Sequence, residues 1–190
     1  AQGQYQDAAA SYEQAAAQAQ TDILAADAAR RDDALRLAQD SRFRAGLCAI
    51  HLKDYAGAIA ALTPLLREDP PVAYLDQAHY WLAEALFNQQ QYAAAIAEYQ
   101  RVAQDFPQSS IRAEALYGLA WAHYSLQEWA QAAAAFEQAH TANPRGEFAA
   151  DSLFQAGESL LNAGDDAAAE ALCERIRQAH PASELSYRAQ

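Results

Sequence analysis

Residues that could carry out chemistry occur in this sequence, but their spacing assembles no catalytic or metal centre. Serine, histidine and aspartate are all present, yet no G-x-S-x-G turn places a serine as a nucleophile. The glycines form no cluster that could cradle a phosphate with backbone N–H groups. The histidines never show the H-x-x-x-H spacing of zinc ligands; they are His51, His79, His123, His140 and His180. We therefore expect no enzyme activity, no cofactor and no metal.

The two cysteines give no redox or metal motif either. Cys48 and Cys173 belong to no C-x-x-C or Cys/His cluster. We interpret them as two small buried thiols, with a disulfide as the alternative.

Composition excludes further classes of protein. The chain has 190 residues, 13 basic and 25 acidic, and a net charge of −12. Lys53 is the only lysine, which argues against a nucleic-acid binder. Alanine dominates a hydrophobic fraction of 52%, which favours helices, and no stretch is long and apolar enough to cross a bilayer. Because the chain begins Ala1-Gln2-Gly3 and contains no Met, we expect a piece of a longer protein, with a signal peptide or lipid anchor possible upstream.

A period of 37 residues organises the chain. Three kinds of position repeat with it: a proline, a small residue and a large or aromatic residue. The prolines are Pro70, Pro107, Pro144 and Pro181. The small residues are Gly46, Ala83, Ala120 and Gly157 in one column, and Ala58, Ala95, Ala132 and Ala169 in another. Aromatic residues fill a further column, Phe43, Tyr80, Tyr117 and Phe154. Several columns in one register indicate four copies of one structural unit.

Each copy has the pattern of two helices joined by a short turn. In the second copy we predict helices over residues 77–88 and 92–104, with the turn at 89–91 and a stop at Phe106-Pro107. Ser109 or Ser110 is expected to cap the next helix, which starts near Arg112. Pro64 predicts a kink or early break near residues 60–61, because proline disrupts a helix interior.

The two small columns have a packing explanation. Where two helices cross closely, a side chain larger than alanine would hold the backbones apart. One small column lies on each first helix and the other on each second helix, so we expect them at the crossing point of each pair. The large residues beside the crossing are Leu62, Tyr99 and Phe136.

This pattern resembles the tetratricopeptide repeat (TPR) family. The third copy carries the resemblance best, with Leu119-Ala120, His123-Tyr124, Trp129, Ala132, Phe136, Ala139 and Pro144. The resemblance implies an all-α, right-handed α-solenoid of helix–turn–helix repeats, here with a period of 37 residues instead of the usual 34.

The repeat register predicts a single solenoid fragment over residues 1–190. Full repeats are expected at 39–75, 76–112, 113–149 and 150–181. Residues 1–38 fit a partial repeat plus extended helices with a short break near residues 20–22, and residues 182–190 fit the start of a further helix.

In the family, the first helices line the concave face, and this implies a groove that binds a partner peptide or helix. Three columns of this sequence fall on that face, at helical intervals of four and three residues. The predicted partner-binding residues are Phe43, Leu47, Ile50, Tyr80, Glu84, Phe87, Tyr117, Trp121, Tyr124, Phe154, Glu158 and Leu161. Ordinary packing between repeats is the alternative interpretation of the aromatic positions.

Acidic residues accompany these columns at Asp40, Glu84, Glu114, Asp151 and Glu158. An acidic rim around aromatic residues would favour a partner with Arg or Lys beside apolar residues, although a solvated charged face explains it equally well. The family subtype that grips a carboxylate tail uses Lys and Asn, and those positions here are acidic or apolar.

Two function classes remain: a protein–protein interaction scaffold with an unidentified protein partner, and a structural spacer or self-associating array within a larger protein. The turns Phe106-Pro107-Gln108-Ser109 and His180-Pro181-Ala182-Ser183 resemble those of bacterial envelope TPR proteins, such as the Tol–Pal coordinator and the barrel-assembly lipoprotein. We therefore expect a periplasmic or cell-envelope location, with a cytoplasmic one as the alternative.

Overall fold

A computed structural model describes residues 2–25, 28–67 and 72–179 of the chain. These residues form helices joined by turns, with no strand among them, and they divide into two compact units, Ala1–Gln91 and Tyr92–Gln190, here called unit 1 and unit 2. Unit 1 contains α1 (Gln2–Ala25), α2 (Ala28–His51), α3 (Tyr55–Leu62), the 3₁₀-helix η1 (Thr63–Arg67) and α4 (Leu75–Asn88). Unit 2 contains α5 (Tyr92–Asp105), α6 (Arg112–Ser125), α7 (Trp129–Ala142), α8 (Ala149–Ala163) and α9 (Asp166–Ala179). The predicted all-α fold class is confirmed.

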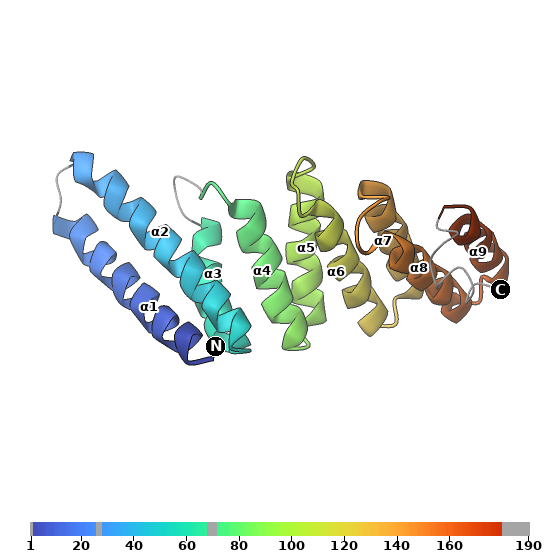
Figure 1. Cartoon of the computed structure of the whole chain (residues 1–190), viewed down its shortest axis with the longest axis horizontal. Coiled ribbons are helices and arrows are strands. Elements are labelled where there is room, and N and C mark those ends of the chain that lie inside the picture. The colour runs from blue at the N-terminus through green and yellow to red at the C-terminus, as the bar shows by residue number, and fades with distance from the viewer. Residues whose placement is uncertain (1, 26–27, 68–71, 180–190) are drawn as a thin grey trace. The chain divides into compact units, whose positions relative to one another are not determined.

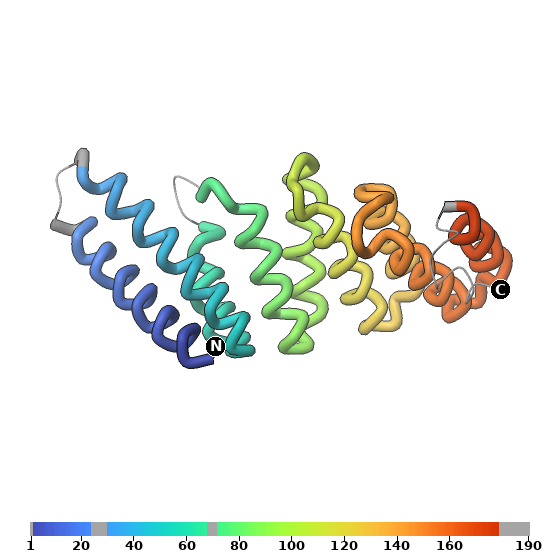
Figure 2. The backbone as a smooth tube through the Cα atoms, in the orientation of Figure 1, coloured from blue at the N-terminus to red at the C-terminus, as the bar shows by residue number. Residues whose placement is uncertain are grey.

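Within each unit, helices that follow one another in sequence pack side by side (Figure 1). In unit 1, α1 and α2 form a long antiparallel hairpin (Figure 2). The start of α1 meets the end of α2, where the rings of Tyr5 and His51 stack at 4.7 Å between centroids. In unit 2, α5 packs on α6, α6 on α7, α7 on α8 and α8 on α9. Each helix therefore buries its apolar side against its sequence neighbours.

The small columns are buried as predicted. Ala58, Ala83, Ala95, Ala120 and Ala132 are all 0% exposed. The large residues predicted beside them are buried too, with Leu62 and Phe136 at 0% and Tyr99 at 1%. At Gly46, an added Cβ would come within 2.7 Å of Leu62 Cγ, so the close approach is real there. At Gly157 an added Cβ would meet nothing within 4 Å, so alanine would fit there, as it does at this column position in the second and third copies.

Within each of four helix pairs, an equivalent turn joins the first helix to the second. Four residues spaced by 37, one in each turn, adopt a left-handed backbone, with φ of 61° at Lys53, 60° at Gln90, 60° at Gln127 and 81° at Gly164. Two backbone hydrogen bonds close every turn; in the last they run from Gly164 N to Leu161 O and from Asp165 N to Leu160 O. The predicted turn at 89–91 is confirmed.

Some predicted helix boundaries are confirmed and others are wrong. The early break caused by Pro64 is confirmed, because α3 ends at Leu62 and continues as the 3₁₀-helix η1. The break near residues 20–22 is wrong, because α1 runs unbroken to Ala25. A run of Ala and Gln supports helix through that point, and a single Thr or Asp costs too little to end it.

The serine cap before α6 is also wrong. The cap residue is Ile111, which makes no side-chain cap bond, and Ser109 Oγ accepts a hydrogen bond from Ile111 N at 3.3 Å instead. The predictions for Pro70, Pro181 and residues 182–190 lie outside the described residues.

Two helical glycines of unit 2 give opposite predictions for stability. An added Cβ at Gly118 would lie 2.5 Å from Tyr99 Cζ, and the buried ring has little freedom to move. We expect Gly118→Ala to lower the free energy of unfolding by about 1–3 kcal/mol. Gly157→Ala should raise it by about 0.5–1 kcal/mol, because alanine loses less backbone entropy in a helix. Chemical denaturation measures both changes, and equal effects of the two variants would contradict the packing.

Gly164 tests the left-handed turn. Its surroundings leave space for a methyl group, so only the backbone conformation opposes a side chain there. We expect Gly164→Ala to lower the free energy of unfolding by about 1 kcal/mol, the cost of a left-handed L-residue. Gly157→Ala is the matched control, since it adds the same methyl group in open space with a helical backbone. A Gly164→Ala variant as stable as the wild-type chain would refute this account.

Candidate functional site

Three of the predicted partner-binding residues form an aromatic row on α6. Tyr117 and Trp121 meet edge to face at 6.1 Å between ring centroids, and Trp121 and Tyr124 do so at 5.3 Å. The row is positioned by the helical intervals of four and three residues, which place all three side chains on one face. We call Tyr117, Trp121 and Tyr124 the α6 aromatic row.

The inner edges of this row rest on the core. Phe136 of α7, which is fully buried, meets the ring of Tyr117 at 5.6 Å and that of Trp121 at 5.4 Å, both edge to face. The side chains of the row are nevertheless only half-buried, so part of each ring stays accessible. The rings of Tyr117 and Trp121 therefore pack against the core and also present surface.

Three contacts join the α6 aromatic row to α8 and the residue just before it. The hydroxyl of Tyr117 donates a 2.6 Å hydrogen bond to Asp151 Oδ2, and the ring of Tyr117 stacks on Phe148 at 4.7 Å. At the other end of the row, Asn162 Nδ2 donates a long hydrogen bond of 3.5 Å to the Tyr124 hydroxyl. These contacts hold the rings of Tyr117 and Tyr124 in place.

The bond to Asp151 also changes the acidity of Tyr117. Burial raises the pKa of Tyr117 to about 12, and the hydrogen bond and negative charge of Asp151 add to the rise. Burial likewise raises the pKa of Tyr74 in unit 1, where the nearby Asp40 adds to the effect. Both tyrosines are therefore neutral hydrogen-bond donors at neutral pH.

The predicted site residues on α8 differ in exposure. Phe154 and Glu158 are half-buried, whereas Leu161 is 56% exposed, the most exposed of five large apolar residues at the surface of the described part of the chain. Leu161 precedes Asn162, which donates a hydrogen bond to Tyr124 of the α6 aromatic row.

Unit 1 contains the equivalent positions on α2 and α4. The ring of Phe43 meets Tyr74, which precedes α4, at 4.5 Å, and Tyr80 meets Trp81 edge to face at 5.1 Å. Ile50 packs against a small buried cluster of alanines from α2, α3 and α4. The remaining predicted residues of unit 1 are half-buried; they are Leu47, Glu84 and Phe87.

Sequence reasoning missed Tyr74 and Phe148. Each lies just before a first helix and packs on the aromatic residue of the previous first helix, in the pairs Phe43–Tyr74 and Tyr117–Phe148. The repeat spacing could have identified both residues, because Tyr74, Ile111 and Phe148 form one more column with a spacing of 37 residues.

A hollow of about 400 Å³ in unit 1 was also missed. It lies among α1, α2, α3 and η1, and its lining is mostly small, including Ala16, Ala45, Gly57 and Pro64. Arg42 crosses from α2 to α1 at its edge and donates a 3.0 Å hydrogen bond to Gln20 Oε1. The sequence feature that could have indicated this hollow is Pro64. Because α3 ends early before Pro64, less α-helix covers the alanines that line the hollow.

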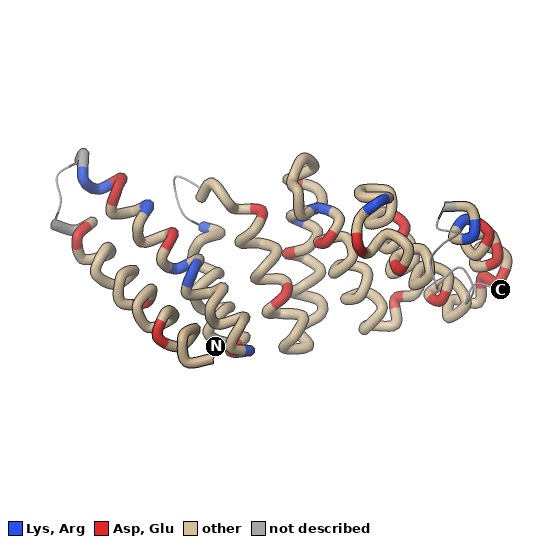
Figure 3. Tube along the Cα trace, in the orientation of Figure 1, with Lys and Arg blue, Asp and Glu red and all other residues tan. Residues whose placement is uncertain are grey.

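Both units carry an excess of acidic residues. Arginine concentrates along α2 in unit 1, and acidic residues occur on helices of both units (Figure 3). Residues 1–91 contain twelve acidic and seven basic side chains. Residues 92–179 contain twelve acidic and five basic side chains. The electrostatic field of unit 2 therefore attracts cationic groups.

No group of three His, Cys, Asp or Glu side chains that could hold a metal occurs in the described part of the chain. Cys48 and Cys173 are free thiols, the first buried and the second half-buried. Among the described helices, none has the length and apolarity that crossing a membrane requires.

The Tyr117–Asp151 bond predicts a loss of stability in alkali. Tyr117 has its ordinary pKa of 10.0 when unfolded and a pKa of about 12 when folded. Its neutral form therefore contributes fully below pH 10, and the contribution falls as the pH rises toward 12. We expect Asp151→Asn to lower the pKa of Tyr117, measured by NMR of ¹³C-labelled tyrosine, because the carboxylate no longer opposes the phenolate. Asp105→Asn on α5 is the charge-matched control, and an unchanged Tyr117 pKa in Asp151→Asn would contradict the assignment.

Solved structures share this fold. The structure of MamA is 22% identical, with a TM-score of 0.61, and covers 76% of this chain and 79% of its own. YrrB, described as a TPR protein with an unusual peptide-binding site, is 19% identical, with a TM-score of 0.62, and covers 83% of this chain and 78% of its own. MamA of Desulfovibrio magneticus RS-1 is 17% identical, with a TM-score of 0.63, and covers 94% of this chain and 98% of its own. No curated protein matches the sequence.

Sequence models of the tetratricopeptide repeat match four overlapping or successive stretches, residues 1–73, 49–118, 113–145 and 151–183. These stretches include nearly all the repeats that the period of 37 predicts. Together with the paired helices and the shared fold, they show that the chain belongs to the tetratricopeptide repeat family.

Proposed function

We propose that this chain is a non-enzymatic scaffold that binds a peptide or helix of a partner protein. In unit 2 the binding face consists of the α6 aromatic row together with Phe154, Glu158 and Leu161 of α8. In unit 1 the equivalent face consists of Phe43, Leu47 and Ile50 on α2 and Tyr80, Glu84 and Phe87 on α4.

The proposal rests on the α6 aromatic row, whose rings are packed in place by neighbouring residues and yet remain partly accessible to solvent. The rings of Tyr117 and Trp121 rest on the buried Phe136, and the Tyr117 hydroxyl is hydrogen-bonded to Asp151. Rigid aromatic side chains lose little entropy on binding and offer a large contact area, so they serve well as anchors. The peptide-binding description of the similar structure YrrB supports this reading.

The partner segment is expected to combine apolar and basic residues. Leu161 and the aromatic rings supply apolar area, while Glu158 and the acidic excess of unit 2 favour Arg or Lys beside it. Because salt screens the attraction between these charges, we expect salt to weaken the complex.

Peptide selection tests this function directly. We would select peptides from a random 15-residue library on the immobilised chain and measure their affinity by fluorescence anisotropy. We expect Leu161→Ser to weaken the selected peptides by about tenfold, the loss of about 1.4 kcal/mol of buried apolar contact. The matched control is Leu37→Ser on α2, a leucine that is 53% exposed and lies outside the proposed face.

The outcomes separate the two function classes. Equal effects of Leu161→Ser and Leu37→Ser would reject the proposed face. Failure to select any peptide, together with concentration-dependent assembly of the chain in sedimentation experiments, would favour the spacer or self-associating array instead.

We also propose a bacterial cell-envelope setting, with the periplasm as the compartment. The support is the turn resemblance in residues 106–109, together with a spacing of 37 residues. Fractionation of the source cells tests it, and recovery of the protein in the cytoplasmic fraction would overturn it.

A further inference from the structure

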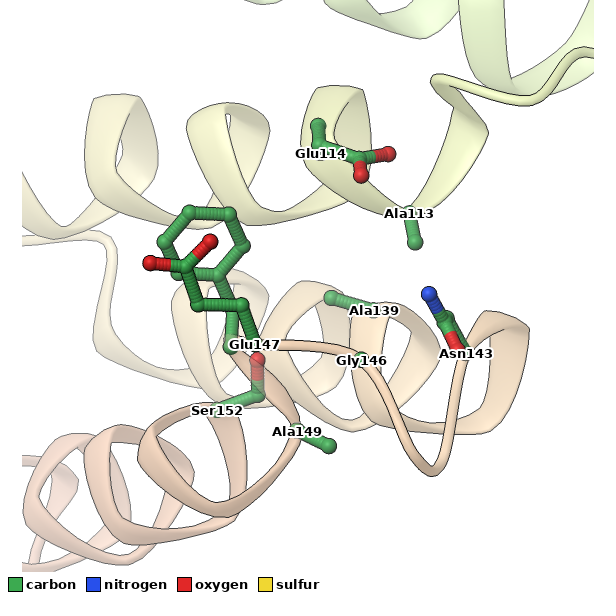
Figure 4. Close-up of a pocket in the computed structure, with 9 residues that line it drawn as sticks. Ala113, Glu114, Ala139, Asn143, Gly146, Glu147, Ala149 and Ser152 are labelled. Atoms are coloured by element: carbon green, nitrogen blue, oxygen red, sulfur yellow. The ribbon is translucent and has the colours of Figure 1, made fainter.

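A small hollow lies beside the α6 aromatic row in unit 2. It is formed by the start of α6, the end of α7, the α7–α8 loop and the start of α8 (Figure 4). Its free volume is about 20 Å³, enough for about one water-sized group. Phe148 lines the hollow and also stacks on Tyr117, so the hollow directly adjoins the proposed binding face.

Two buried polar atoms at this hollow have no hydrogen-bond partner among the described residues. They are Glu114 Oε2 and Ser152 Oγ, and Ser152 is only 1% exposed. Glu114 faces the hollow from α6, and the Ser152 hydroxyl points from α8 toward the loop at Glu147 (Figure 4). Buried polar atoms without partners are costly. A carboxylate oxygen only accepts hydrogen bonds, and a serine hydroxyl accepts as well as donates, so a hydrogen-bond donor in this hollow would serve both atoms.

The charge around the hollow defines the donor. Glu114 and Glu147 both line it, and no Lys, Arg or His does. The carboxyl end of α7, capped by Asn143, adds partial negative charge. The amino ends of α6 and α8 are partly positive, and the two carboxylates offset them. The donor should therefore be a cation of about the size of a water molecule.

We propose that this hollow binds the ammonium group of a lysine side chain from the partner segment. An ammonium has three N–H donors on a compact head, and Glu114 and Ser152 offer it two acceptors. The guanidinium of arginine is larger and planar, so the hollow selects lysine over arginine. This inference rests on the proposed function, since the lysine comes from a segment that lies across the face of α6 and α8.

A small probe tests the hollow independently of any peptide. Ethylammonium is titrated into the ¹⁵N-labelled chain, and amide shifts are followed by NMR at Glu114, Gly146 and Ser152. We expect saturable shifts at these amides. Tetramethylammonium, which has the same charge but no N–H donor, should give no saturable shifts.

Variants identify the acceptors. Glu114→Gln and Ser152→Ala should each weaken ethylammonium binding by about tenfold or more, as expected for a lost hydrogen bond to a charged group. The control is Glu170→Gln, an exposed carboxylate on α9, which should bind ethylammonium as the wild-type chain does. Thermal unfolding of each variant confirms that the fold is retained.

Each result decides the proposal. No saturable shift, equal shifts with tetramethylammonium, or wild-type affinity in Glu114→Gln would overturn it and leave the hollow as a site for an ordered water molecule only. If ethylammonium binds but no peptide can be selected, the proposal that the hollow binds an ammonium group is retained and the proposed partner-binding face is rejected. If peptides bind and ethylammonium does not, the proposed partner-binding face is retained and the proposed lysine site is rejected.

Discussion

Close approach between neighbouring helices is the physical constraint on which the rest of the structure depends. A single α-helical hairpin of this size cannot bury enough apolar area to offset the entropy of folding, so it must pack on the next hairpin. Alanines that are fully buried allow this approach, and Leu62, Tyr99 and Phe136 fill the space beside them. Six of the eight positions in the two small columns are alanine, and a bulkier residue there would separate the backbones.

The same packing supports the proposed binding face. Phe136 lies in the core beneath the α6 aromatic row, so the rings of Tyr117 and Trp121 are held by the fold itself. Surface and core are therefore not separate regions here. Substituting Trp121 by a small residue would disturb the core as well as the surface. A substitution at the exposed Leu161 therefore tests binding with less effect on the fold.

The period of 37 residues predicted the helix pairs, the turns and the buried columns, because repetition reveals which positions pack. Local signals were weaker. Ser109 has the right residue type for a cap and α6 begins at Arg112 as predicted, but Ile111 occupies the cap position. The α6 aromatic row was predicted from the resemblance to a known repeat. The hollow at Glu114 and Ser152 was not predicted, because it depends on how the α7–α8 loop packs between α6 and α8, and the 37-residue spacing does not reveal that packing.

The four left-handed turns have one further consequence. Their geometry is fixed by backbone hydrogen bonds and accepts Lys, Gln or Gly at the same position, so it hardly depends on the side chain. Segments cut at equivalent points of two such turns begin and end with the same backbone conformation. The gene could therefore gain or lose a whole copy by recombination without creating a mismatched joint, and the number of copies becomes a quantity that evolution can vary separately from the residues that line the surface.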